Sequence, residues 1–241
     1  MTFSLCKNGL KGAFFVSSLI MLTLHAYAQS TSEKCANESG DAAIEACTEV
    51  ISAEPNNAAA YHSRGFEWDS KGDREKAYND FTKAISIDPE FALAYSSRGT
   101  LWYEIEQYDK AIEDYNSAIK FGGERGKDYR NRGNAWRKKG DFERAFADYN
   151  RAIEIEPDNF RNYFNRGLAY KSSGDSDRAI LDFTTSINLN PNEALSYGHR
   201  GVLYYERQDY ANAITDLQKA LSIDPNDTEL KGYLDKAISR Q

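Results

Sequence analysis

Hydrophobic and polar residues follow a helical period along most of the chain, and the whole pattern recurs every 34 residues. The copies align on the glycine of an Arg-Gly pair, at Gly65, Gly99, Gly133, Gly167 and Gly201. When each copy is numbered from 1 to 34, starting at residue 58, aromatic and small residues recur at positions 4, 8 and 11, and aromatic, small and aliphatic residues recur at 20, 24, 27 and 28. Each set lies along one stripe of an α-helix. The pattern therefore predicts two amphipathic helices in every repeat.

A short polar turn separates the two stripes of each repeat, as in Lys-Gly-Asp at 71–73 and 139–141. Glycine suits the left-handed residue that ends one helix, and aspartate caps the next. The two helices should then be antiparallel, with residues facing one another when their repeat positions add to about 31. This rule pairs position 8 with 24, 11 with 20, and 4 with 27, so that each large ring meets a small residue.

A 34-residue helix-turn-helix unit with Gly at position 8, an aromatic residue at 11, Ala at 20 and 27 and Pro at 32 resembles the tetratricopeptide repeat. The resemblance covers residues 58–227. It implies an all-α fold, a right-handed α-solenoid of five stacked helical hairpins. The expected hairpins are residues 58–91, 92–125, 126–159, 160–193 and 194–227.

The chain departs from the family pattern in three ways. Position 4 is Tyr rather than Trp, and position 11 is Trp in three of the repeats. The second repeat lacks the proline at position 32, and residues 121–126 there are FGGERG. Three glycines add backbone freedom, so we expect a joint between the second and third repeats.

Both ends of the array are predicted to be capped. Residues 29–57 form a degenerate N-terminal half-repeat, because DAAIEACTEVISA at 41–53 matches the second helix of a repeat. Residues 228–241 form a C-terminal capping helix, with Leu230, Leu234, Ala237 and Ile238 on one stripe. Terminal repeats need such one-sided helices for solubility.

The first 28 residues have the features of a secretory signal peptide. Lys7 and Lys11 precede an apolar run, Ala26-Tyr27-Ala28 follows it, and the segment contains no acidic residue. A retained membrane anchor is the alternative, but an apolar run of about 13 residues is shorter than the roughly 20 that span a bilayer. We therefore expect export without stable membrane insertion, to a bacterial periplasm or, alternatively, into the medium.

Two cysteines follow the predicted cleavage site, Cys35 and Cys47. In an oxidising compartment, a pair this close, on either side of a Gly-Asp turn, predicts a local disulfide that contributes on the order of 3 kcal/mol. Two free buried thiols are the alternative. The spacing is unlike that of metal ligands, and we expect neither a metal nor a cofactor.

Charge and histidine content argue against two functional classes. Removing Lys7 and Lys11 from 30 basic residues leaves 28 against 37 acidic residues, a net charge of −9, which argues against nucleic-acid binding. After the predicted cleavage site the histidines are His62 and His199, and neither belongs to a catalytic motif. We therefore expect a protein that is not an enzyme.

Arginine at position 7 and aspartate at position 23 recur in all five repeats. Their positions add to 30, so we expect an ion pair across each hairpin rather than a row of anion-binding arginines. The predicted pairs are Arg64–Asp80, Arg98–Asp114, Arg132–Asp148, Arg166–Asp182 and Arg200–Asp216.

The first helix of each repeat has a second face, formed by positions 2, 5, 9, 12 and 13, which lies away from the core stripe. In tetratricopeptide arrays, which these repeats resemble, this face lines a concave groove that binds peptides. Near the third repeat it is rich in cations, which should point away from the core. The predicted binding residues are Lys127, Arg130, Asn134, Arg137, Lys138, Arg161, Phe164, Asn165, Lys171, Tyr103 and Tyr205.

Apolar residues on the same face also suggest a partner site, because exposed apolar groups rimmed by charge often bind proteins. They are Phe66, Leu93, Tyr103, Phe164, Leu168, Leu195, Val202 and Tyr205. The alternative is that the cations are only solvated and the apolar residues contact neighbouring repeats. Carboxylate-clamp domains of the family grip a terminal carboxylate at the positions of Arg130, Asn134 and Asn165. The remaining cations of such a clamp are missing here, because Leu195 and His199 do not supply them.

These patterns predict an exported, non-catalytic adaptor or scaffold. Its expected partner is a protein, or an acidic and partly apolar peptide segment bound in the groove. The alternative is a regulator of an envelope enzyme, or a binder of an anionic envelope polymer, acting through the same groove. The sequence indicates no oligomeric state.

Overall fold

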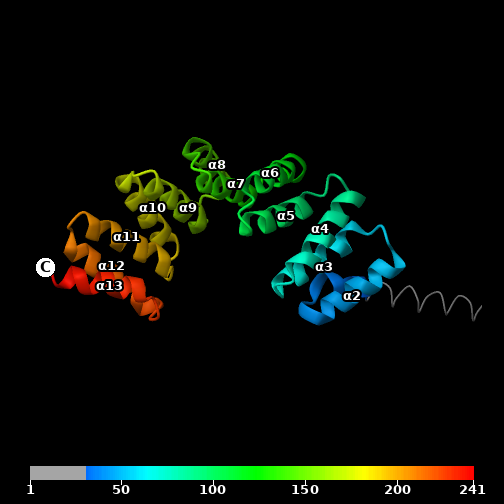
Figure 1. The fold of residues 1–241 in the computed structure, drawn as a ribbon, viewed down its shortest axis with the longest axis horizontal. Helices are drawn as coiled ribbons and strands as arrows, with labels where there is room; N and C mark the ends of the chain where they lie inside the picture. The colour runs from blue at the N-terminus through cyan, green and yellow to red at the C-terminus, as the bar shows by residue number, and fades with distance from the viewer. Residues whose placement is uncertain (1–30) are drawn as a thin grey trace, which may run out of the picture. The chain divides into compact units, whose positions relative to one another are not determined.

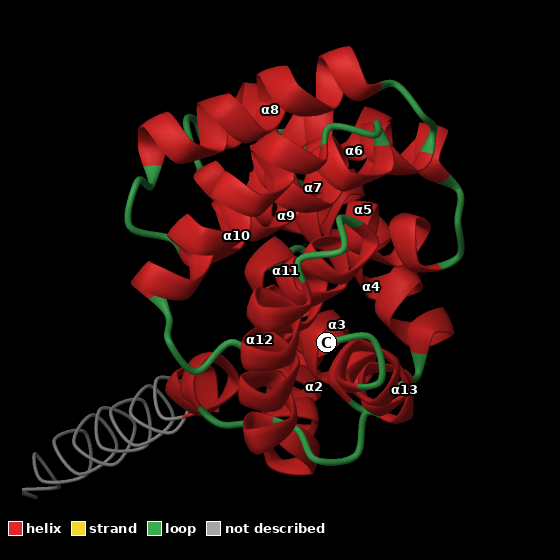
Figure 2. Cartoon of the chain, turned by 90° about the vertical axis from the view of Figure 1, so that its left-hand side faces the viewer, coloured by secondary structure: helices red, strands yellow, loops and turns green. Residues whose placement is uncertain are grey.

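The computed structural model describes residues 31–241, and the predicted signal peptide lies outside the described residues. Within this range the chain consists of helices and turns without a strand (Figure 2). The chain forms two compact units, of which the first ends at Leu101 and the second covers Trp102–Gln241. The glycine-rich segment 121–126 therefore lies inside the second unit, and the expected joint is not where the units divide.

In the first unit, residues 31–37 are helical and are followed by α2 (Gly40–Ala53), α3 (Ala58–Ser70), α4 (Arg74–Ile87) and most of α5 (Ala92–Glu104). Helix α2 packs on α3, and α3 packs on α4. A disulfide joins Cys35 to Cys47 of α2, with Cα atoms 4.6 Å apart, as predicted. Both cysteines are buried in a small core with Val50 and Ala60.

The second unit continues as a series of helical pairs (Figure 1). Its helices are α6 (Tyr108–Gly122), α7 (Gly126–Lys138), α8 (Phe142–Ile155), α9 (Phe160–Ser172), α10 (Ser176–Leu189), α11 (Ala194–Glu206), α12 (Tyr210–Ile223) and α13 (Thr228–Ile238). Helices α7 and α8, α9 and α10, and α11 and α12 form hairpins, and each hairpin packs on the next. Helix α13 packs on α12 and α11. This succession of helical pairs confirms the predicted fold class.

The turns inside the hairpins follow the predicted chemistry. Between α7 and α8, Gly140 adopts the left-handed conformation with φ of 80°, which glycine reaches without steric cost. Asp141 then caps α8, because its side chain accepts a hydrogen bond from the Arg144 backbone N–H. In the last hairpin Gln208 takes the same conformation with φ of 64°, so the turn tolerates other residues.

The interior of each hairpin obeys the facing-position rule. Gly133 lies so close to the buried ring of Tyr149 that a Cβ atom there would be 2.9 Å from Cε1. Gly167 meets Phe183 at the same distance. Trp136 packs in one cluster with Ala145, as positions 11 and 20 should. Large rings therefore fill the space left by glycine and alanine on the facing helix.

The predicted arginine–aspartate pairs form an ion-pair ladder wherever both residues belong to one unit. The pairs are Arg64–Asp80, Arg132–Asp148, Arg166–Asp182 and Arg200–Asp216. In each, Nε and Nη2 donate to the two carboxylate oxygens at 2.6–2.9 Å. Arg98 and Asp114 belong to different units, so that pair stays a prediction.

The same arginines also bond to the preceding second helix. Arg132 donates from Nη1 to Asn116 Oδ1 at 2.7 Å, and Arg166 donates to Asn150 at 2.7 Å. Arg200 donates to the Thr184 hydroxyl at 2.8 Å. Each arginine of the ladder therefore joins three helices.

Candidate functional site

Helix α7 carries five of the predicted binding residues, and they fall into two groups. Lys127 and Lys138, near the two ends of the helix, are exposed. Arg130, Asn134 and Arg137, which follow one another at intervals of about one turn, are only partly exposed. The helix therefore has a partly buried polar centre between two solvated cations.

Arg130 is held against the junction of α8 and α9. Its Nη1 donates to Asn162 Oδ1 at 2.9 Å, and its side chain is only 12% exposed. Asn162 is fully buried, and its Nδ2 donates to the carbonyl groups of Ala152 and Glu156 at the end of α8. The expectation that Arg130 points away from the core is therefore wrong.

The charge of Arg130 is poorly compensated. The nearest carboxylate, that of Glu156, lies 3.9 Å from Nη1. Burial lowers the pKa of Arg130 below its ordinary value, although Glu156 opposes this. By contrast, the hydrogen bonds of Asp182 and Asp216 raise the pKa of their arginine partners in the ladder. Arg130 is thus a largely buried cation whose charge is offset only at longer range, by Glu156 and Asp128.

Arg137, unlike Arg130, has no anionic partner among the described residues. Its guanidinium lies close to Tyr103 of α5 and Tyr149 of α8. Burial raises the pKa of both tyrosines, and the nearby positive charge of Arg137 opposes this rise. Its Nε is buried without a hydrogen-bond partner among residues 31–241. No carboxylate of this range lies within 4.0 Å of its guanidinium. The tyrosines therefore position Arg137 but leave its charge unpaired.

The residues that resemble a carboxylate clamp all have partners inside the protein. Asn134 accepts a hydrogen bond from the Tyr149 hydroxyl at 2.8 Å. Asn165 donates from Nδ2 to the Arg161 carbonyl one turn earlier, also at 2.8 Å. Arg130 donates to Asn162, as described above. A ligand would therefore meet a preorganised polar network on α7 and α9.

The predicted residues of α9 have mixed roles. Arg161 is exposed and lies over the Phe160 ring, 4.6 Å from its centroid. Phe164 is half-buried and packs on Phe183, with the ring centroids 5.9 Å apart. Lys171 reaches towards α11, where its Nζ lies 3.5 Å from a ring nitrogen of His199. Arg161 is thus the exposed cation of this helix, and Phe164 mainly supports the core.

The apolar residues of the first-helix face are only partly available to a partner. Leu195 is 53% exposed, as predicted, but Val202 is buried, so the prediction for Val202 is wrong. Tyr205 packs on Tyr210 and Tyr233, with ring centroids 5.8 and 5.4 Å apart. The structure therefore places Tyr205 in a cluster with α12 and α13, whereas Tyr103 borders the cations of α7.

Sequence reasoning missed the setting of His199. Its ring packs on Phe164 and Phe183, with centroids 5.8 and 5.6 Å away. Burial and the nearby charges of Lys171 and Arg137 lower its pKa to about 4, while Asp227 opposes the shift. His199 takes the place of the serine or asparagine that the other four repeats have at position 6, and this departure was the available signal.

Acid should destabilise the second unit through His199. Its folded pKa of about 4 lies below its ordinary value of 6.5, so the unfolded chain binds the proton first, and stability falls as the pH drops through this window. The loss should reach roughly 3 kcal/mol, at about 1.4 kcal/mol per pKa unit. Urea unfolding between neutral pH and about pH 4 measures it against a His199→Phe variant. Equal pH dependence in both proteins would contradict the assignment.

Two further observations on residues 31–241 concern membrane-spanning helices and metal-ligand clusters. None of the helices in this range is both long enough and apolar enough to cross a membrane. Nor do His, Cys, Asp and Glu side chains of this range gather in groups of three or more that could hold a metal ion.

Family comparisons agree with the repeat pattern. A family model described as TPR repeat matches residues 133–174. A model described as Tetratricopeptide repeat matches residues 194–227. A second model with the same description matches both residues 58–91 and residues 160–193. Together the matches cover residues 58–91 and 133–227. No curated protein matches the sequence.

Several solved structures are similar to this one. YrrB, described as a TPR protein with an unusual peptide-binding site, is 25% identical with a TM-score of 0.62, over 80% of this chain and 99% of YrrB. A tetratricopeptide repeat protein from Parabacteroides merdae is 20% identical with a TM-score of 0.63, over 96% of this chain and 86% of that one. MamA is 23% identical with a TM-score of 0.60, over 68% of this chain and 96% of MamA. The last two similarities show the fold alone.

Proposed function

The chain belongs to the tetratricopeptide repeat family, and from this premise we propose that it is an exported, non-catalytic adaptor that binds an acidic, partly apolar segment of a partner protein. Repeats of this family form scaffolds for protein–protein interaction. YrrB, the similar structure described above, is a TPR protein with a peptide-binding site. The proposed segment lies along the first helices of the second unit, over α7 and α9.

The incompletely paired positive charge at the centre of α7 is the observation that carries this proposal. Arg130 and Arg137 are held by neutral groups, Asn162 and two tyrosines, rather than by close carboxylates. A carboxylate from a ligand would provide charge-assisted hydrogen bonds that the protein itself does not supply. Because the guanidinium groups are already positioned, little conformational entropy is lost when the ligand arrives.

The surroundings of these arginines favour a peptide with some apolar character. Lys127 and Lys138 are exposed at the ends of α7 and attract an acidic segment from a distance. Tyr103, half-buried beside Arg137, offers ring surface at the edge of the same site. A segment of alternating acidic and apolar residues fits both features.

Reversing the two exposed lysines tests the placement of the site. Lys127→Glu with Lys138→Glu should weaken binding of a synthetic peptide of alternating aspartate and leucine by about tenfold, because rim charges mainly set the association rate. The melting temperature should stay nearly unchanged, since both side chains are solvated. Fluorescence anisotropy with labelled peptide measures the affinity.

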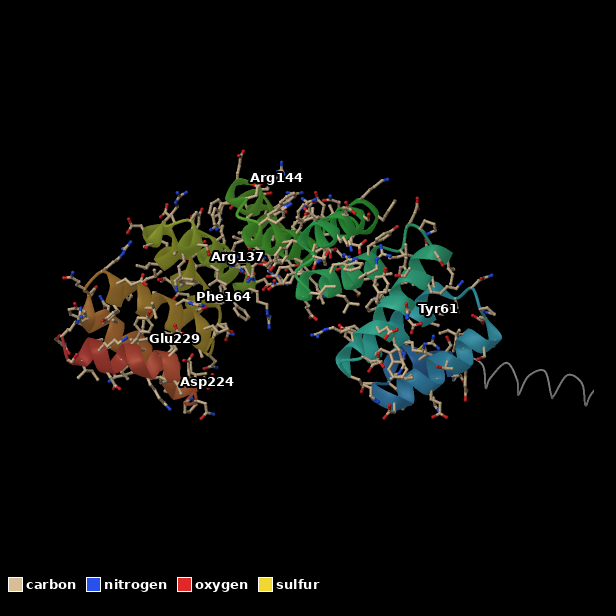
Figure 3. All side chains as sticks on the ribbon, in the orientation of Figure 1. Tyr61, Arg137, Arg144, Phe164, Asp224 and Glu229 are labelled. Carbon is tan, nitrogen blue, oxygen red and sulfur yellow. A yellow bond between two sulfur atoms is a disulfide. The ribbon has the colours of Figure 1, made fainter. Side chains whose placement is uncertain are left out.

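The matched control reverses two cations elsewhere in the same unit. Lys110→Glu with Arg144→Glu makes the same change in net charge on α6 and α8, where both side chains are exposed. Arg144 lies over the Trp136 ring, and Figure 3 shows it on the other side of the unit from Arg137 and Phe164. Peptide affinity should be retained in this control. Equal weakening in both variants would show that net charge, rather than this face, governs binding.

A second candidate function uses the same cations. A regulator of an envelope enzyme could hold an anionic envelope polymer against the solvated groups of Lys127, Lys138 and Arg161. Binding through exposed charges alone weakens steeply as salt rises, whereas a peptide retains its apolar contacts. Persistent peptide binding at high salt favours the adaptor, and loss of all binding favours the polymer.

The Cys35–Cys47 disulfide supports export, because disulfides form and persist in oxidising compartments. The mature protein, isolated from the envelope of the producing cell, should begin at or near Gln29 and have no thiol that can be alkylated. Intact mass before and after alkylation without reductant measures both. A mass that retains residues 1–28, or two alkylated thiols in the mature chain, would contradict export through a cleaved signal.

A further inference from the structure

A recess lies where α9, α11 and α13 meet in the second unit. Its volume is about 260 Å³. Leu195, Leu230 and Tyr233 form its apolar wall, and Glu206, Asp227 and Glu229 contribute carboxylates (Figure 3 labels Glu229 on α13). It is therefore a chemically different surface from the cationic centre of α7.

Gly198 of α11 explains how α13 can close one side of this recess. A Cβ atom at Gly198 would lie 2.8 Å from Cδ1 of Leu230, so glycine leaves room for the Leu230 side chain between the two helices. Leu195, one turn earlier on α11, stays 53% exposed beside the opening. The recess is thus a feature of the packing between α11 and α13, with an apolar side chain left uncovered at its edge.

The carboxylates of the recess are largely uncompensated. Asp227 caps α13 by accepting a hydrogen bond from the Leu230 backbone N–H at 2.9 Å. Glu206 and Glu229 are exposed, and neither forms an ion pair or a side-chain hydrogen bond within residues 31–241. Lys171 is the one cation of the lining, and His199 beside it is neutral at neutral pH because its pKa is about 4. The recess therefore carries net negative charge.

We propose that this recess is a second subsite for the segment bound on α7, and that it takes one basic side chain of that segment. The aliphatic stem of a lysine or arginine would pack on Leu195, Leu230 and Tyr233 while its charged end pairs with Glu206 and Glu229. The volume suits one long side chain and is below the range of about 300–1,000 Å³ for small-molecule sites. This inference rests on the proposed function.

The arrangement of the helices sets the spacing within the ligand. Helix α9 lies between α7 and α11 in the series of first helices, and α7 contacts α9. Packed helix axes are about 8–10 Å apart, so the two subsites are separated by roughly 20 Å. An extended peptide advances about 3.3 Å per residue, which places the basic residue about six positions from the acidic residues.

Synthetic peptides test the subsite directly. The first has an aspartate pair and a lysine about six positions away, in either chain direction. In the second the lysine is next to the aspartates, and in the third norleucine replaces it. The first peptide is made with the lysine either before or after the aspartates. One of these two forms should bind about tenfold more tightly than the second and third peptides. This advantage corresponds to about 1.4 kcal/mol, the contribution of one modest interaction.

Variants of the recess separate this inference from the proposed function. Glu206→Gln with Glu229→Gln should remove the advantage of the spaced lysine while leaving binding of the norleucine peptide unchanged. Both residues are exposed, so the variant should melt like the wild type. Glu206→Lys with Glu229→Lys should reverse the preference, towards a peptide with glutamate in place of the spaced lysine.

Each outcome either supports or overturns the inference. Equal affinity for the spaced and adjacent lysine peptides would overturn the subsite and leave the acidic site on α7 standing. Equal affinity for lysine and norleucine would show that the recess takes an apolar side chain instead. Failure of every peptide to bind the wild-type protein would overturn both the proposed function and the inference.

Discussion

An Arg132→Ala variant should lose about 3–5 kcal/mol of unfolding free energy, because removing one partner leaves a buried charge uncompensated. Arg132 holds the Asp148 carboxylate through two hydrogen bonds of 2.9 and 2.6 Å. Asp148 is only 5% exposed, and burial raises its pKa even with the arginine in place. Without Arg132, this carboxyl group must either remain charged in a poorly solvated site or take up a proton.

Chemical denaturation of the single variants and of the Arg132→Ala, Asp148→Ala double variant measures this coupling. The double variant should be more stable than the sum of the two single losses predicts, because neither charge is then left alone. Arg144→Ala is the matched control: its ion pair with Asp141 is largely exposed and should contribute less than about 1 kcal/mol. Additive losses in the ladder would show that the pair does not stabilise the hairpin as described.

Arg137→Gln should weaken binding of the aspartate–leucine peptide by about a hundredfold. A hydrogen bond to a charged group contributes about 1.5–3 kcal/mol, and each 1.4 kcal/mol is a factor of ten in affinity. Glutamine retains an N–H donor for the neighbouring tyrosines but removes the charge. The substitution therefore tests the cation rather than the packing between Tyr103 and Tyr149.

Titration of the labelled peptide gives the affinity, and thermal melting shows whether the variant folds as the wild type does. Arg144→Gln is the control, since it removes an exposed arginine from the second helix of the same hairpin. Unchanged affinity in Arg137→Gln would mean that the cation at the centre of α7 does not meet the ligand. A similar loss in Arg144→Gln would point to a general electrostatic effect.

The hairpins could be predicted in detail because their geometry depends only on helical periodicity and turn length. The rule that facing positions add to about 31 places Arg132 opposite Asp148 and Gly133 opposite Tyr149, as observed. The Cys35–Cys47 bridge was also predictable, because its two residues are close in sequence. These features are local and repeat along the chain.

The candidate site was less predictable because it depends on contacts between repeats. A helical wheel puts Arg130 on the groove face, but it cannot show that Asn162, from the next repeat, draws the guanidinium inward. Likewise, His199 is partly covered by rings of α9 and α10, and Val202 is covered within the C-terminal cluster. Departures from the repeat pattern therefore decide which residues of the face remain available.

The contacts of the arginine ladder have a consequence for cooperativity. Arg132, Arg166 and Arg200 each bond to an aspartate of their own hairpin and to a residue of the preceding one. In stacked repeats, stability is the sum of the intrinsic stability of each repeat and of the interfaces between neighbours. Opening the α7–α8 or the α9–α10 hairpin breaks contacts of its own arginine and of the next arginine along the chain, whereas opening α11–α12 breaks only those of Arg200. Melting that starts at an inner hairpin is therefore costlier than melting of the last one, so the inner repeats of the unit should lose their structure together.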